Sequence, residues 1–170
     1  MSDISRLQHA VASAIQDLRE EYLKHGRAKS YYSINNGLCE DFAESVVAQV
    51  GRSSPTLFTL CNQELQVEDE DTWDRTLLEG YWGITPPKHF TWDTLSAVNF
   101  GYHVWVTCDK RHYDSECPTG VDSFFDLPLF RRCLVADMRK RGIDCDEVVS
   151  DDVVPPPLCP IPRPTLAVSA

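Results

Sequence analysis

The chain has 170 residues, a formal net charge of −10 at pH 7 and 42% apolar residues. This length favours one compact domain with a sizeable core. The acidic balance argues against nucleic acid or an anionic membrane as the main partner. No stretch approaches the roughly 18 apolar residues of a membrane span, and the N-terminus lacks the basic-then-apolar pattern of a signal peptide. We therefore expect a cytoplasmic protein with no nucleic-acid or membrane partner.

The chain contains seven cysteines, an odd number that leaves at least one thiol unpaired in any disulfide scheme. Without a signal pattern, most of them are expected to be reduced, several as small buried hydrophobes. No Cys-x-x-Cys pair occurs. A zinc site built from Cys108, His112 and Cys117 is a minor alternative, because this spacing matches no common structural zinc pattern.

Two amphipathic helices are predicted in the N-terminal third. Residues 3–25 carry apolar side chains at intervals of three and four, which predicts a long helix with one buried stripe. A second helix is predicted over 38–50, ending before Gly51, with Cys39 in its first turn. A core cysteine and a nucleophile fit that position equally well.

The middle of the chain is less regular. Residues 56–60 are predicted as a strand and 72–79 as a short helix. Trp73, Trp82 and Trp92 either form a satellite core, the favoured interpretation, or line a cleft.

A strand pattern begins at Tyr102, with residues 103–107 rich in β-branched and aromatic side chains. The chain then turns through 109–111 and returns over 112–116. If 107 and 112 flank the turn, 105 pairs with 114 and 103 pairs with 116. Either Asp114 or Glu116 can then lie against His103, and a shift of one residue would move both acids to the other face.

The C-terminal part is predicted as a helix over 129–141, ended by Gly142, and then a proline-rich tail over 150–170. With residues 1–149 forming a single domain of helices and antiparallel strands, the fold class is α+β.

Cysteine, histidine and acid follow one another along the chain as Cys39, His103 and Asp114. A cysteine at a helix N-terminus lies at the positive end of the helix dipole, which favours the thiolate. A histidine can take up the thiol proton, and a carboxylate can fix the histidine tautomer. This order is that of a nucleophile, its base and the group that orients the base.

Three motifs resemble the papain-like cysteine protease superfamily in its broad sense, and most closely the transglutaminase-core group. They are Gly37-Leu38-Cys39 followed by Phe42-Ala43, then His103-Val104-Trp105-Val106, and then Tyr113-Asp114. The resemblance implies a helix carrying the nucleophile Cys39, packed on an antiparallel sheet carrying the base His103 and the orienting Asp114. Glu40 and Asp41 depart from the pattern, because carboxylates beside a cysteine disfavour its thiolate.

The expected activity is a thiol-dependent hydrolase, such as a peptidase or amidase, or a transglutaminase-like acyltransferase that acts on a peptide or amide bond. The backbone N–H of Cys39 is a natural oxyanion donor. Asn35, Asn36, Trp105 and Glu116 are further candidates for oxyanion or substrate binding. No cofactor or metal is expected. The alternatives are a catalytically inactive papain-like interaction module, and a metal hydrolase using His103, His112 and Asp114.

Overall fold

The computed structural model describes residues 1–69 and 74–145. Within them the protein combines helices with one three-stranded antiparallel sheet, so the predicted α+β class is confirmed at that level. Trp73, the beginning of the helix predicted over 72–79 and the tail predicted over 150–170 lie outside the described residues.

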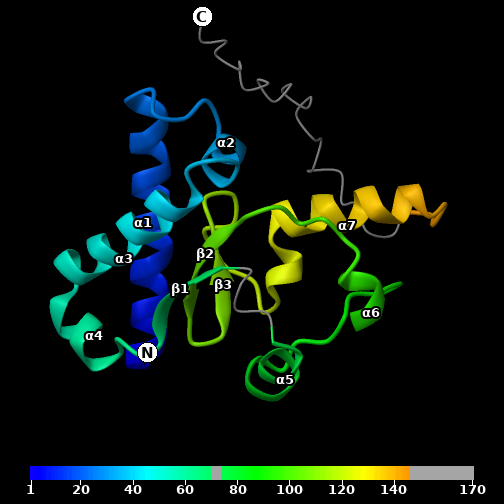
Figure 1. The fold of residues 1–170 in the computed structure, drawn as a ribbon. Helices are drawn as coiled ribbons and strands as arrows, with labels where there is room; N and C mark the ends of the chain where they lie inside the picture. The colour runs from blue at the N-terminus through cyan, green and yellow to red at the C-terminus, as the bar shows by residue number, and fades with distance from the viewer. Residues whose placement is uncertain (70–73, 146–170) are drawn as a thin grey trace, which may run out of the picture.

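Four helices precede the first strand along the chain, and Figure 1 shows these N-terminal helices beside the sheet. In the first half the elements are α1 (Asp3–Lys24), α2 (Tyr31–Asn35), α3 (Cys39–Ser53), α4 (Pro55–Leu60) and strand β1 (Leu65–Asp69). In the second half they are α5 (Arg75–Leu77), the π-helical turn η2 (Leu78–Trp82), α6 (Trp92–Leu95), β2 (Val104–Cys108), β3 (Arg111–Tyr113), the 3-10 turn η3 (Phe124–Asp126) and α7 (Pro128–Lys140).

The prediction of a strand over residues 56–60 is wrong, because the structure has helix α4 there. Pro55 occupies the first turn of this helix, where its missing N–H costs nothing and its fixed φ suits helix geometry. The hydroxyl of Thr59 donates to the carbonyl of Pro55 at 2.9 Å, a bond that spans one helical turn. Backbone N–H bonds from Phe58 to Ser54 and from Cys61 to Leu57, both at 2.9 Å, are those of a helix and not of a strand.

Strand β2 is the central strand of the sheet, between β1 and β3. Thr107 pairs with His112, which confirms the hairpin register predicted from the turn. All five residues of β2 are buried, so both faces of the strand are covered. Continued past the strands, the same register places residue 114 opposite 105 and residue 116 opposite 103, so that residue 114 lies diagonal to residue 103 on the same face.

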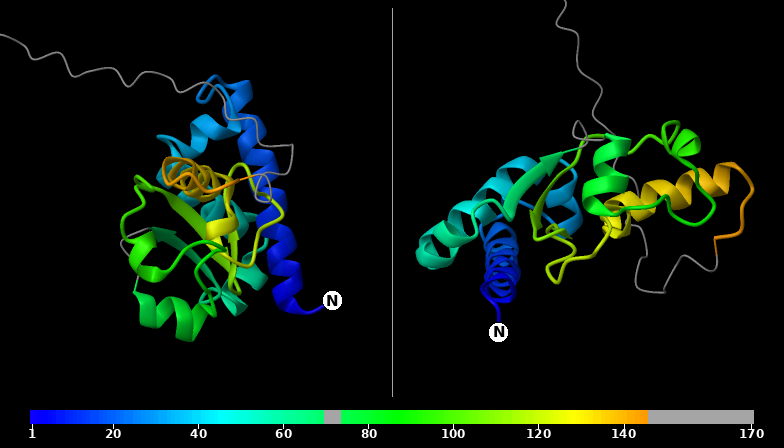
Figure 2. Two further views of the ribbon diagram at one scale, coloured as in Figure 1. Left: turned by 90° about the vertical axis from the view of Figure 1, so that its right-hand side faces the viewer. Right: turned by 90° about the horizontal axis from the view of Figure 1, so that it is seen from below.

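Two apolar clusters fill the two sides of the sheet. In the first cluster, α1 and α3 pack on the sheet, and the rings of Tyr22 and Phe42 meet edge to face with centroids 5.3 Å apart. In the second, Trp105 of β2 packs against Phe124 and Phe130. The right-hand view of Figure 2 shows this arrangement from below, with the sheet between the N-terminal helices on one side and helices α5 and α7 on the other.

Gly120 lies against the residue that precedes Asp114. Its φ is +72°, and a Cβ added there would lie 2.5 Å from the ring of Tyr113, which is itself buried. We expect Gly120→Ala to lower the free energy of unfolding by about 3 kcal/mol, because left-handed strain of about 1–2 kcal/mol adds to overpacking. The measurement is urea unfolding at pH 7.

Gly142→Ala is the matched control. Gly142 has a φ of +69° with nothing within 4 Å of the added Cβ, so only the backbone strain remains. Equal losses in the two variants would contradict the packing part of this prediction.

None of the helices in the described ranges is long and apolar enough to cross a membrane.

Candidate active site

Cys39 is the first residue of α3 and is only 5% exposed. Gly37, with a φ of +135°, lets the chain turn sharply from the end of α2 into this helix. Phe42 and Ala43, one turn further on, are buried in the first apolar cluster and fix the helix against the sheet. The sequence motif around Cys39 therefore forms a rigid turn and a packed first helical turn.

His103 lies directly before β2, and its side chain is completely buried. Its Nε2 is 3.3 Å from Oδ2 of Asp114, whose side chain is 2% exposed. Because Nε2 lies against the carboxylate, Nδ1 is the ring nitrogen left for the thiol of Cys39. The ring is further held by Phe130 and by stacking on Trp105, with centroids at 5.7 and 6.1 Å.

Cys39 and His103 change each other's protonation. Burial by itself raises the pKa of Cys39, but hydrogen bonding with His103 and with the backbone N–H groups of Val104 and Glu40 lowers it below its ordinary value. Burial also lowers the pKa of His103, but hydrogen bonds with Asp114 and Cys39 raise it to about 9. Both net shifts favour a thiolate beside an imidazolium.

The carboxylate of Asp114 is fixed by the turn that follows it. Its Oδ1 accepts the backbone N–H groups of Glu116 and Cys117 at 2.9 and 2.8 Å, which leaves Oδ2 for His103. These two backbone bonds alone are enough to orient the carboxylate of Asp114, without the contact to His103. Between the two acids that the sequence left open, the structure places Asp114 against His103.

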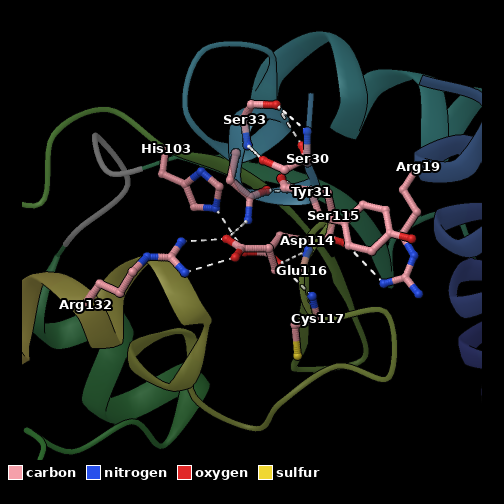
Figure 3. A network of polar contacts seen from close by, with 11 residues as sticks. Arg19, Ser30, Tyr31, Ser33, His103, Asp114, Ser115, Glu116, Cys117 and Arg132 are labelled. Carbon is pink, nitrogen blue, oxygen red and sulfur yellow. Dashed lines mark hydrogen bonds and ion pairs between the residues drawn. The ribbon is translucent and has the colours of Figure 1, made fainter. Parts of the chain in front are cut away.

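Glu116 points elsewhere. Its carboxylate makes two bonds to the guanidinium of Arg132 on α7, at 2.9 and 2.5 Å, and accepts a third from Nδ2 of Asn35 at 2.9 Å. Figure 3 shows Arg132 directed at Glu116 and His103 directed at Asp114. Glu116 thus belongs to a polar network behind the site instead of facing the thiol.

The other candidate binding residues are placed in three different ways. Asn35 is 1% exposed and its amide is engaged by Glu116 and by the hydroxyl of Ser115, so we assign it to the network and not to an oxyanion. Asn36 is exposed at the end of α2. Trp105 is only 2% exposed, and its ring stacks on that of His103.

Trp82 and Trp92 pack against the second apolar cluster, in agreement with the favoured satellite-core interpretation. Arg132 and Ser115 are the polar residues near the site that sequence reasoning missed. Arg132 lies in a helix with several other basic residues, and nothing in the neighbouring sequence distinguishes it from them.

His112 is a second buried histidine, 1% exposed, and burial lowers its pKa to about 4. Its Nδ1 accepts the indole N–H of Trp105 at 3.1 Å, so Nε2 carries the proton in the neutral ring. Among the described residues no hydrogen-bond partner meets this Nε2 atom. The folded protein therefore holds His112 in its neutral form.

Acid should destabilise the protein through His112. The unfolded chain protonates it near 6.5, whereas the folded chain does so only near 4, so the unfolded state binds more protons between these values. We expect this residue to remove about 3 kcal/mol from the free energy of unfolding as pH falls from 7 to 4. Urea unfolding across this range measures the loss.

His112→Phe should lack this part of the acid dependence, whereas substitution of the exposed His9 by Asn should retain it. An unchanged pH slope in His112→Phe would contradict the assignment.

In the described part of the chain, no three His, Cys, Asp or Glu side chains gather closely enough to hold a metal ion. Comparisons with protein families, curated proteins and solved structures found no match to this chain.

Proposed function

We propose that the protein is a papain-like thiol hydrolase or acyltransferase that acts on a peptide or amide bond, with Cys39 as nucleophile, His103 as base and Asp114 as orienting acid. The observation that carries the proposal is the buried contact series from the thiol through the imidazole to the carboxylate. A cysteine at the start of a helix, packed on an antiparallel sheet beside the histidine and the acid, is also the arrangement that resemblance to the transglutaminase core implies.

The geometry supports a two-step acyl transfer. His103 holds the thiol proton as imidazolium while the Cys39 thiolate attacks the carbonyl carbon, so that an S–C bond forms. When the tetrahedral intermediate collapses, the C–N bond breaks and the imidazolium gives its proton to the leaving amine. Water or a second amine then attacks the thioester and gives its proton to the neutral His103, the S–C bond breaks, and the thiolate–imidazolium pair is restored.

The oxyanion formed in each step needs donors. The N–H of Cys39 lies at the start of α3, where backbone N–H groups lack helical partners and the helix dipole favours negative charge. Asn36, exposed at the turn before this helix, is the remaining side-chain candidate from the sequence. Preorganised donors of this kind stabilise the charge that develops in the transition state.

The test is acylation by p-nitrophenyl acetate, whose ester releases p-nitrophenolate as the thioester forms. We expect a burst of about one equivalent per chain, with the acetyl group on the peptide that contains Cys39 by mass spectrometry. Cys39→Ala should lose the burst, and Cys61→Ala, which removes another buried thiol, should keep it. Acetylation spread over other residues, with none on Cys39, would overturn the proposal.

A catalytically inactive interaction module of the same fold is the second candidate, and the 5% exposure of Cys39 favours it. Such a protein would keep the three side chains packed together but would not admit an electrophile to the sulfur. Failure of both p-nitrophenyl acetate and small alkylating agents to modify Cys39 in the folded protein would support this candidate.

A further inference from the structure

We propose that Arg132 is a positioning residue for the site, and that it acts through Glu116 to hold the turn that aims Asp114 at His103. The inference rests on the proposed function, because it concerns the same histidine and thiol. Helix α7 carries none of the three proposed catalytic residues. Through Arg132 it would nevertheless control the protonation of Cys39.

The turn of residues 114–117 is held from several elements at once. The hydroxyl oxygen of Ser115 in this turn lies 2.8 Å from the carbonyl oxygen of Tyr31 and 2.7 Å from Oδ1 of Asn35, so these two acceptors share its single proton. The carbonyl of Ser115 accepts a bond from Arg19 of α1 at 3.3 Å. Figure 3 shows these groups around the turn. The turn is thus anchored to α1 and α2 on one side.

Arg132 supplies the anchor on the other side. Its guanidinium binds both carboxylate oxygens of Glu116, and the two side chains are only 17% and 16% exposed. A bidentate arginine–carboxylate pair fixes direction as well as distance. The ring of Tyr32 on α2 lies 4.6 Å from the guanidinium carbon, which restricts the arginine further.

The pair is coupled to catalysis through one backbone group. The N–H of Glu116 is one of the two donors that hold Oδ1 of Asp114, so movement of Glu116 moves the donor that orients the carboxylate. Loss of Arg132 would also leave the Glu116 carboxylate largely buried without its counter-charge, two residues from Asp114. Both effects disturb the Nε2–Oδ2 contact that raises the pKa of His103.

Helix α7 offers a closely matched control. Arg141 makes an ion pair with Asp137 at 2.7 Å and lies over the ring of Phe90, as Arg132 pairs with Glu116 and lies over Tyr32. None of these control contacts involves the turn of residues 114–117. Arg132→Met in α7 and Arg141→Met directly after its last residue therefore remove similar interactions, and only Arg132 is connected to Asp114.

The experiment measures the rate at which iodoacetamide alkylates Cys39 from pH 5 to 10, together with the melting temperature. We expect both variants to melt earlier than wild type. Only Arg132→Met should alkylate more slowly at pH 7, by about tenfold, with its acid limb shifted towards the pKa of an ordinary thiol. Arg132→Lys, which restores the charge, should recover part of the wild-type profile.

If Arg132→Met melts earlier but keeps the wild-type alkylation profile, the arginine is merely structural and the inference is overturned. If Arg132→Met does not fold, the alkylation profile of Glu116→Gln is measured instead. This substitution weakens the Arg132–Glu116 pair without changing the size of the side chain. A wild-type Cys39 that titrates as an ordinary thiol would overturn both this inference and the proposed function. A wild-type profile with an activated thiol, unchanged in Arg132→Met, would overturn this inference alone.

Discussion

Replacement of His103 by asparagine should slow the alkylation of Cys39 at pH 6.5 by about 100-fold, because the thiolate loses the imidazolium that stabilises it. In the structure, burial raises the pKa of Cys39, and hydrogen bonding with and charge attraction to His103, together with the N–H groups of Val104 and Glu40, bring that pKa below its ordinary value. Without the imidazole, burial in an apolar setting should keep the sulfur protonated, as it does for Cys108, whose pKa is raised to about 12.

The measurement is the initial rate of iodoacetamide addition at Cys39, followed by mass spectrometry, with circular dichroism to confirm folding. His9→Asn is the control, because His9 is exposed on α1 and takes no part in the site. Equal rates at Cys39 in His103→Asn and wild type would show that the histidine does not activate the thiol.

Asp114→Asn should reduce turnover of p-nitrophenyl acetate by about 1,000-fold with the fold preserved. The amide can still accept the N–H bonds of Glu116 and Cys117 through its oxygen. Its NH₂ group, however, would face Nε2 of His103, which then has to act as an acceptor and leaves Nδ1 protonated. A protonated Nδ1 in the neutral ring cannot take up the thiol proton.

Glu116→Gln should be much milder, at about tenfold, because this residue reaches His103 only through the turn. The measurement compares the steady-state rates of Asp114→Asn and Glu116→Gln at saturating p-nitrophenyl acetate. A larger loss in Glu116→Gln than in Asp114→Asn would transfer the orienting role to Glu116.

The local sequence was enough to predict α1, α3, the hairpin of β2 and β3, and α7, but it did not indicate α2 or β1. The apolar stripe of α1 follows from its repeat and β2 from its β-branched and aromatic residues, and the polar turn between β2 and β3 fixes the register. That register places Glu116 opposite His103 and Asp114 diagonal to it, so the sequence brought both acids near the histidine without deciding between them. The position of Cys39 at a helix start followed from the glycine turn before it.

The polar network was out of reach for a physical reason. The bond between Asn35 and Glu116 joins residues 81 apart in sequence, and that between Asn35 and Ser115 joins residues 80 apart. No periodicity encodes such a pairing, since it depends on how α2 and the turn after β3 pack together. The same is true of Arg132, which only the docking of α7 distinguishes from the other basic residues of its helix.

The pH dependence of Cys39 alkylation in the unmodified protein tests the central claim most directly. If a thiolate–imidazolium pair exists, the rate should rise at a pH clearly below the value of about 8.5 for an ordinary thiol. It should then stay level until His103 loses its proton near 9. A single rise centred at 8.5 or above, as for an isolated buried cysteine, would contradict the account.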